Sequence, residues 1–247
     1  MRKSLFIALV LAAICIIPSC KKDSQKDKFV FGDTQGMSVT SYDSVTLVEQ
    51  YSHTSWGYSL DLNGDGQDDI QFHSEVLGSI QFGQDIVTTI ACLNENVALM
   101  GYNRSQELYL HMDSTLLTED SVWWEVNVHK TYSCEAIDET DQVVETKEKF
   151  ALLEIDANDT FDDNCTFKST NVILKGRTYT YFEVPENVGN ILYNYQVTHK
   201  GDCDVFPMDE VKYIGFKFTE NDKSRLGWMK IILHHDSVEL LETAIQE

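Results

Sequence analysis

Apolar and polar residues alternate with a period of two along much of this chain, and this alternation constrains the fold more than any other feature. Residues 123–129 show it clearly, because Trp124, Val126 and Val128 fall on one face of a strand. Further segments rich in β-branched and apolar residues recur along the chain, at 45–48, 86–93, 108–112, 150–156, 172–174, 178–184, 192–197, 213–218 and 228–233. The sequence therefore predicts a chain built mainly of strands.

Strands with one apolar and one polar face, joined by loops of Asn, Asp and Gly, predict an all-β fold, an antiparallel two-sheet β-sandwich. The pattern leaves a jelly-roll or concanavalin-like arrangement and an immunoglobulin-like arrangement open. A parallel α/β fold would need interleaved helices, and the sequence shows no convincing helical period over three turns. The one exception is residues 237–246, where Val238, Leu241 and Ile245 are spaced to line a short terminal helix. We expect one sandwich domain over residues 32–247.

One loop has the spacing D-x-N-x-D-G-x-x-D, which matches the first nine positions of an EF-hand calcium loop. Gly66 occupies position six, where the sharp turn favours a residue without a Cβ. The spacing predicts a Ca²⁺ site whose ligands are Asp61, Asn63, Asp65, Gln67 and Asp69. Position twelve is Phe72 rather than the EF-hand Glu, and the flanks alternate with period two, so they predict strands. A metal-free polar hairpin turn is the alternative.

This strand–loop–strand unit resembles the calcium loops of FG-GAP and integrin-type β-propeller repeats. A propeller would repeat the unit, whereas the signature D-x-[DN]-x-D-G occurs once in this chain. Together with Gly227-Trp228 near the C-terminus, the early loop also resembles uncharacterised exported β-sandwich proteins of bacteria. The resemblance implies a calcium-clamped hairpin in a sandwich and no particular activity.

The N-terminus indicates export. Basic Arg2 and Lys3 precede an apolar run at 5–17, which is shorter than the roughly 20 residues that span a bilayer. The following Ile17-Pro18-Ser19-Cys20 resembles the lipobox of bacterial lipoproteins. The resemblance implies a signal peptide at 1–19, a lipid-carrying Cys20, and a polar tether at 20–31. It also implies a cell-envelope location, at the outer membrane and facing the periplasm or the surface. An ordinary cleaved signal with an incidental Cys is the alternative.

Four further cysteines follow the signal and Cys20, and none has C-x-x-C spacing; they are Cys92, Cys134, Cys165 and Cys203. An oxidising compartment allows them two disulfides in three connectivities. Cys165 and Cys203 both follow acidic loop-like sequence, which slightly favours that pair.

Candidate catalytic residues are few. Glu154, Asp156 and Asp159 resemble the E-x-D-x-x-E catalytic strand of retaining β-glucanases with a concanavalin-like sandwich. The resemblance implies Glu154 as nucleophile, Asp156 as its helper and Asp159 as acid/base, although that family has Glu at the third position. A strand that ends in an acidic loop is the alternative. The seven His residues show no H-E-x-x-H or similar zinc spacing.

The formal net charge of −21 argues against nucleic acid and anionic lipid headgroups as partners. We therefore expect a membrane-anchored, calcium-binding lipoprotein that acts as a binding or scaffold module without catalytic activity. A glycan or a protein is the expected ligand, and a β-glucanase-like hydrolase is the alternative.

Overall fold

The computed structural model describes residues 29–48, 56–79, 83–118, 123–137, 141–161, 165–203, 206–235 and 237–247. Within these ranges the chain forms strands and one 3₁₀ turn, without an α-helix. In chain order the elements are β1 (Met37–Val48), β2 (Trp56–Leu60), β3 (Ile70–Ser79), β4 (Gly83–Cys92), β5 (Val97–Thr118), β6 (Trp123–Ser133), β7 (Gln142–Leu152), β8 (Thr166–Lys168), β9 (Asn171–Lys175), β10 (Tyr179–Phe182), β11 (Glu186–Val188), β12 (Ile191–His199), η1 (Gly201–Cys203), β13 (Val211–Glu220), β14 (Lys223–Leu233) and β15 (Ser237–Gln246).

These strands form two sheets, which confirms the predicted two-sheet all-β fold. The larger sheet has the order β1-β15-β14-β13-β5-β6-β12-β10, with β11 paired to β12 and with β7 and β8 paired to β5. The smaller sheet has the order β2-β3-β4-β9. Pairing between the described strands is antiparallel except where β6 and β12 run parallel.

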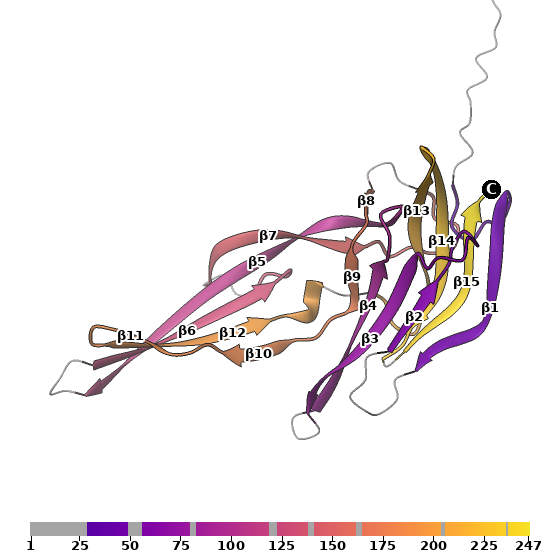
Figure 1. Cartoon of the computed structure of the whole chain (residues 1–247). Helices are drawn as coiled ribbons and strands as arrows, with labels where there is room; N and C mark the ends of the chain where they lie inside the picture. The colour runs from indigo at the N-terminus through magenta and orange to yellow at the C-terminus, as the bar shows by residue number, and fades with distance from the viewer. Residues whose placement is uncertain are drawn as a thin grey trace, which may run out of the picture.

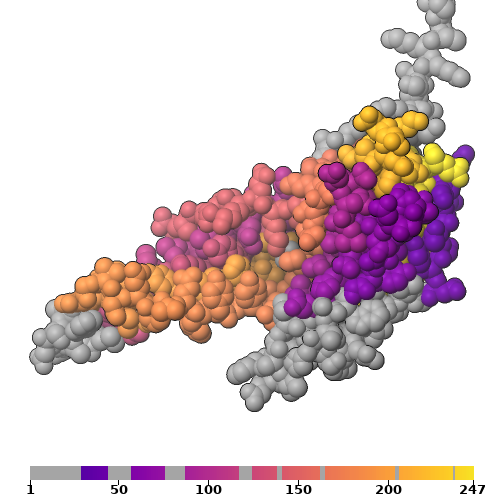
Figure 2. All heavy atoms as spheres, in the orientation of Figure 1, coloured from indigo at the N-terminus to yellow at the C-terminus, as the bar shows by residue number. Residues whose placement is uncertain are grey.

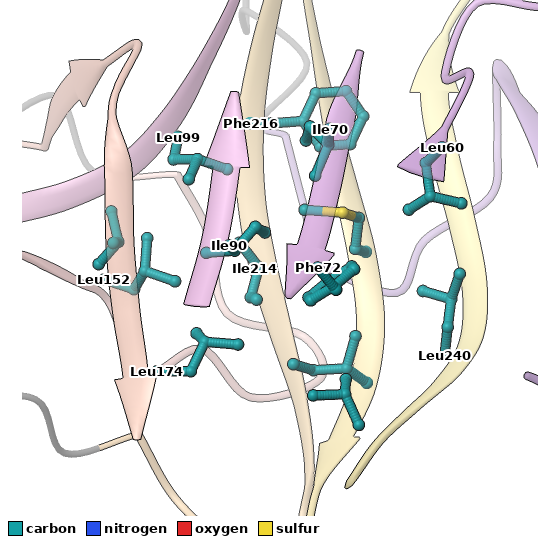
Figure 3. Close-up of a cluster of buried hydrophobic side chains, with 14 of the residues drawn as sticks. Leu60, Ile70, Phe72, Ile90, Leu99, Leu152, Leu174, Ile214, Phe216 and Leu240 are labelled. Atoms are coloured by element: carbon teal, nitrogen blue, oxygen red, sulfur yellow. The ribbon is translucent and has the colours of Figure 1, made fainter. Parts of the chain in front are cut away.

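The main hydrophobic core lies where the small sheet packs on the β13–β15 end of the large sheet (Figures 1 and 3). Ile70, Phe72 and Ile90 of the small sheet have no measurable exposure. They belong to one cluster with Ile214 and Phe216 of the large sheet. In β3 the buried positions alternate with polar Gln71 and His73, as the period-two pattern predicts, whereas β13 is buried on both faces around Ile214.

A second cluster covers the opposite face of the large sheet, around the buried Trp228. The N-terminal segment closes it, because the N–H of Phe31 donates to the carbonyl of Asp159 at 2.9 Å and Phe31 is 2% exposed. Phe29 packs against the same cluster. Residues 29–31 are therefore part of the folded body, inside the stretch expected as tether.

The large sheet extends well beyond the small one. Strand β5 has 22 residues, enough to span roughly 70 Å. Its first residues pair with β13 in the sandwich, whereas its later residues pair with β6 and β7. We call the projecting part, made of β6, β7, β10, β11, β12 and residues 102–118 of β5, the arm (Figures 1 and 2).

A disulfide joins Cys134 to Cys203, with 5.1 Å between the two Cα atoms. The sequence-based preference for Cys165 with Cys203 was wrong. The parallel pairing of β6 with β12 places Tyr132 opposite His199, so the residues that follow the two strands meet at one end. Cys165 instead packs against the cluster around Trp228. Acidic sequence around a cysteine contains no information about this long-range pairing.

The expected helix at 237–246 was also wrong, because this segment is strand β15 between β1 and β14. The pairing register shifts at Leu241, where Lys230 faces Glu242 and Ile231 faces Leu240. One extra residue reverses the alternation, so Val238 and Ile245 share a face although they are seven residues apart. Seven is also two helical turns, and this coincidence explains the helix-like spacing.

Candidate functional site

The loop at residues 61–69 connects β2 to β3 at the point where Leu60 pairs with Ile70. Both of these anchoring side chains are buried in the main core (Figure 3). The strand flanks expected from the sequence are therefore confirmed, and the hairpin presents residues 61–69 at the end of the small sheet.

Asp61, the first predicted ligand, organises the turn. One oxygen of its carboxylate accepts the N–H groups of Gly64 at 2.7 Å and Asp65 at 3.2 Å, and the other accepts the N–H of Gly66 at 2.7 Å. Burial opposes ionisation of Asp61, but these backbone hydrogen bonds outweigh it and lower the pKa of the carboxyl. Gly64 and Gly66 have φ of 77° and 87°, which glycine adopts without strain.

Asn63 and Asp65 continue the same pattern. The Asn63 Oδ1 accepts the N–H of Asp65 at 2.9 Å, and the Asp65 Oδ1 accepts the N–H of Gln67 at 2.8 Å. Asn63 Nδ2 also donates to Asp65 Oδ2 at 3.0 Å. The loop thus carries carboxylate and amide oxygens, the hard ligands that Ca²⁺ takes.

Asp69, the ninth position, differs from the others because it is 1% exposed. Its Oδ2 accepts the N–H of Leu62 at 2.8 Å, and its Oδ1 accepts Asn94 Nδ2 at 2.7 Å. Its carbonyl accepts the N–H of Leu93 at 2.8 Å. These bonds satisfy a buried carboxylate and tie the loop to the turn after β4. No motif in the sequence indicates Asn94, which lies 25 residues away.

The loop carboxylates do not converge on one point in this conformation. Among the described residues, the one group of three or more Cys, His, Asp or Glu ligand atoms within 4.8 Å is Cys134, Asp202 and Cys203. Its two sulfurs are joined in the disulfide, so this group is unsuited to a metal. The donor set at residues 61–69 fits calcium by its oxygen chemistry, and ligation would require its side chains to rearrange.

Glu154, Asp156 and Asp159, which resemble the catalytic residues of β-glucanases, lie after the end of β7. Asp156 pairs with Lys212, with 2.8 Å between Oδ1 and Nζ. Asp159 Oδ2 accepts the N–H of Asp156 at 2.8 Å, and Glu154 is exposed. Asn158 between them has φ of 72°. These contacts describe a polar turn that closes the second cluster, which favours a structural role over catalysis.

The arm presents a second feature that the sequence did not reveal. Cross-strand pairing places several large apolar side chains on one face of its sheet, which we call the aromatic face. Its most exposed members, with their exposed fractions, are Met112 (59%), Leu116 (44%), Tyr181 (43%), Tyr179 (41%) and Trp124 (38%). The other face of the same strands carries mainly polar residues, together with the exposed Phe182 and with Leu192.

Rings on the aromatic face stack across neighbouring strands. His199 lies between Tyr132 and Tyr179, with ring centroids 4.5 Å and 4.8 Å apart. Lys130 Nζ lies 4.6 Å from the centroid of Tyr195. These contacts stiffen the arm, since the spacing of the rings matches that of the strands.

Comparison of the chain with protein-family models, curated proteins and solved structures finds no match. Within the described residues, no helix has the length and apolar character needed to cross a membrane.

Proposed function

We propose that this chain is a non-catalytic binding module of the bacterial cell envelope, anchored through lipid on Cys20 and stabilised by calcium at residues 61–69. The arm is the part of the chain that binds the partner molecule. The single observation behind this proposal is the aromatic face, a set of exposed apolar side chains on one face of the projecting sheet. Exposed apolar patches of this kind mark interaction sites.

A protein is the partner that this face favours over a glycan. Sugars pack against the open faces of aromatic rings, but the rings of Tyr132, His199 and Tyr179 cover one another's faces. Met112 and Leu116 add flexible apolar area of the kind found in protein interfaces. The formal charge of −21 favours a partner surface that is neutral or basic.

Site-specific photocrosslinking in intact cells tests the binding role. A crosslinking amino acid at Tyr181 should give a discrete protein adduct, and the purified partner should bind Tyr181→Ser at least 10-fold more weakly. Thr180 is the matched control, because it is exposed on the adjacent position of β10 and points to the opposite face. Equal adducts at both positions, or none, would refute the proposal. Glycan binding that depends on Tyr181 would replace the protein partner with a sugar.

The calcium claim has a separate test. Mass action stabilises the native state by about 2.7 kcal/mol when free calcium is 100 times the dissociation constant. A chelator should therefore lower the melting temperature and added calcium should restore it, in wild type but not in Asp61→Ala. Asp68→Ala is the matched control, since Asp68 is exposed in the same loop and lies outside the ligand spacing. An identical melting curve with chelator and with calcium would disprove the site.

Anchoring is tested by fractionation of cells that express wild type or Cys20→Ala. Wild type should incorporate radiolabelled palmitate and sediment with membranes, whereas Cys20→Ala should do neither. Labelling of Cys20→Ala at the wild-type level would refute lipidation at this residue.

A further inference from the structure

Two histidines face each other on the polar face of the arm, opposite the aromatic face. His111 on β5 pairs directly with His129 on β6. Asp113 lies two residues after His111 and therefore projects from the same face. Asp141, which immediately precedes β7, reaches His111 from the other side.

The four side chains already contact one another in pairs. His129 Nε2 lies 3.4 Å from Asp113 Oδ2, and His111 Nδ1 lies 3.2 Å from Asp141 Oδ1. The centroids of the two imidazole rings are 6.1 Å apart. His111 and His129 are 56% and 37% exposed, so an ion from solvent reaches them directly.

A polar network orients the Asp113 carboxylate. Asn127 Nδ2 donates to Asp113 Oδ1 at 2.9 Å, and Asn194 Nδ2 donates to Asn127 Oδ1 at 3.3 Å. The bond from Asn127 is the largest cause of the lowered pKa of Asp113, and His129 contributes to it. An ionised carboxylate with one oxygen held by Asn127 turns its other oxygen toward His129.

The separation of this pair suits a tetrahedral metal. Zinc bonds imidazole nitrogen and carboxylate oxygen at about 2.0–2.1 Å, which places two ligand atoms roughly 3.3 Å apart. The observed 3.4 Å between His129 Nε2 and Asp113 Oδ2 agrees with that spacing. The ligand atoms of His111, Asp113 and His129 do not all lie within 4.8 Å of one another, and His111 Nδ1 contacts Asp141 instead. The exposure of His111 leaves its side chain room to turn toward the other two.

We propose that His111, Asp113 and His129 bind a zinc ion on the polar face of the arm. Asp141 accepts the Nδ1–H of His111 in the metal-free arrangement, and zinc binding exchanges this contact for a bond to the ion. The fourth position is open to water or to a side chain of a partner. This site differs from the 61–69 loop in its ligands, because it offers imidazole nitrogen whereas the loop offers oxygen. Sequence spacing missed it because His111 and His129 meet only through pairing of β5 with β6.

Competition titration tests the site. Tag-free protein is titrated with zinc against a chromophoric chelator, and cobalt is then substituted to record the absorption of a tetrahedral ion. We expect one equivalent bound by wild type, with at least 10-fold weaker binding by His111→Gln, His129→Gln and Asp113→Asn. His73→Gln and Asp61→Ala should bind as wild type does, because one removes a distant histidine on β3 and the other a residue of the calcium loop.

Circular dichroism of each variant shows that the fold is intact. The proposal is overturned if wild type binds no zinc, or if the double variant His111→Gln/His129→Gln retains wild-type affinity. Loss of zinc binding in Asp61→Ala alone would place the ion in the 61–69 loop and would also overturn it. The outcome is independent of whether the arm binds a partner protein.

Discussion

Removal of the disulfide by the double substitution Cys134→Ser/Cys203→Ser should destabilise the protein strongly. The bond closes a loop with a sequence separation of 69, and β6 and β12, whose ends it joins, are parallel strands without a direct hairpin connection. In the chain-entropy account, opening a loop of this length returns about 15 cal/mol/K to the unfolded chain, or roughly 4 kcal/mol at 25 °C. For a domain of this size the melting temperature should fall by roughly 8–16 °C.

Thermal unfolding of wild type, of wild type under reductant and of the double variant measures this loss. Hydrogen exchange should locate it, with faster exchange in β6 and β12 and little change in β2 and β3. The arm is the part affected because Asp202, next to Cys203, also accepts the N–H of Cys134 at 3.1 Å and the hydroxyl of Ser133. Without the covalent bond these hydrogen bonds alone hold the end of the parallel pair, so local opening should be easier there.

Cys92→Ser is the matched control, because Cys92 forms no disulfide and lies in the small sheet. It should lower the melting temperature by a few degrees at most. Equal melting temperatures for the reduced and the oxidised protein would refute this expected destabilisation. Peptide mapping that finds Cys165 bonded to Cys203 would refute the pairing itself.

Three further outcomes are expected. Phe72→Ala removes a fully buried ring from the main core and should cost about 3–5 kcal/mol in chemical denaturation; a loss below about 1 kcal/mol would contradict this packing. Gly101→Ala should cost about 2 kcal/mol or more, because the new Cβ would lie 2.1 Å from the carbonyl oxygen of Ala151; wild-type stability would contradict that contact. The hydrogen bond to Asp209 is the largest cause of the raised pKa of His234, so this histidine stabilises the fold fully below its ordinary pKa of 6.5. The stability difference between wild type and His234→Gln should disappear as pH rises through the raised pKa, and a difference that grows with pH would reverse the assignment.

Local sequence was sufficient for the parts of the fold that depend on neighbouring residues. Alternation predicted β6, and the glycine and acid spacing predicted a turn at residues 61–69 with strands on both sides. Leu60, Ile70 and Phe72 are buried as their period-two positions require. Turn geometry is set within a few residues, so the hydrogen bonds of Asp61 follow from the spacing alone.

Long-range pairing was beyond local reasoning. The parallel pairing of β6 with β12 determines which two cysteines form the disulfide. The bulge at Leu241 gives the apolar residues of β15 a spacing that resembles that of a helix. Asn94, which bonds Asp69, lies on the turn after β4 and reaches Asp69 only when β3 pairs with β4.

The sequence by itself determined that this chain folds into strands, where its polar loop turns, and which flanking residues enter the core. Only the tertiary structure showed that the large sheet continues past the small one. Alternation of apolar and polar residues in a strand does not show whether another sheet packs on its apolar face. That extension leaves the aromatic face uncovered and brings His111 opposite His129. Both proposed binding sites on the arm therefore depend on which strands pair and in which register, and the pattern of a single strand does not determine this.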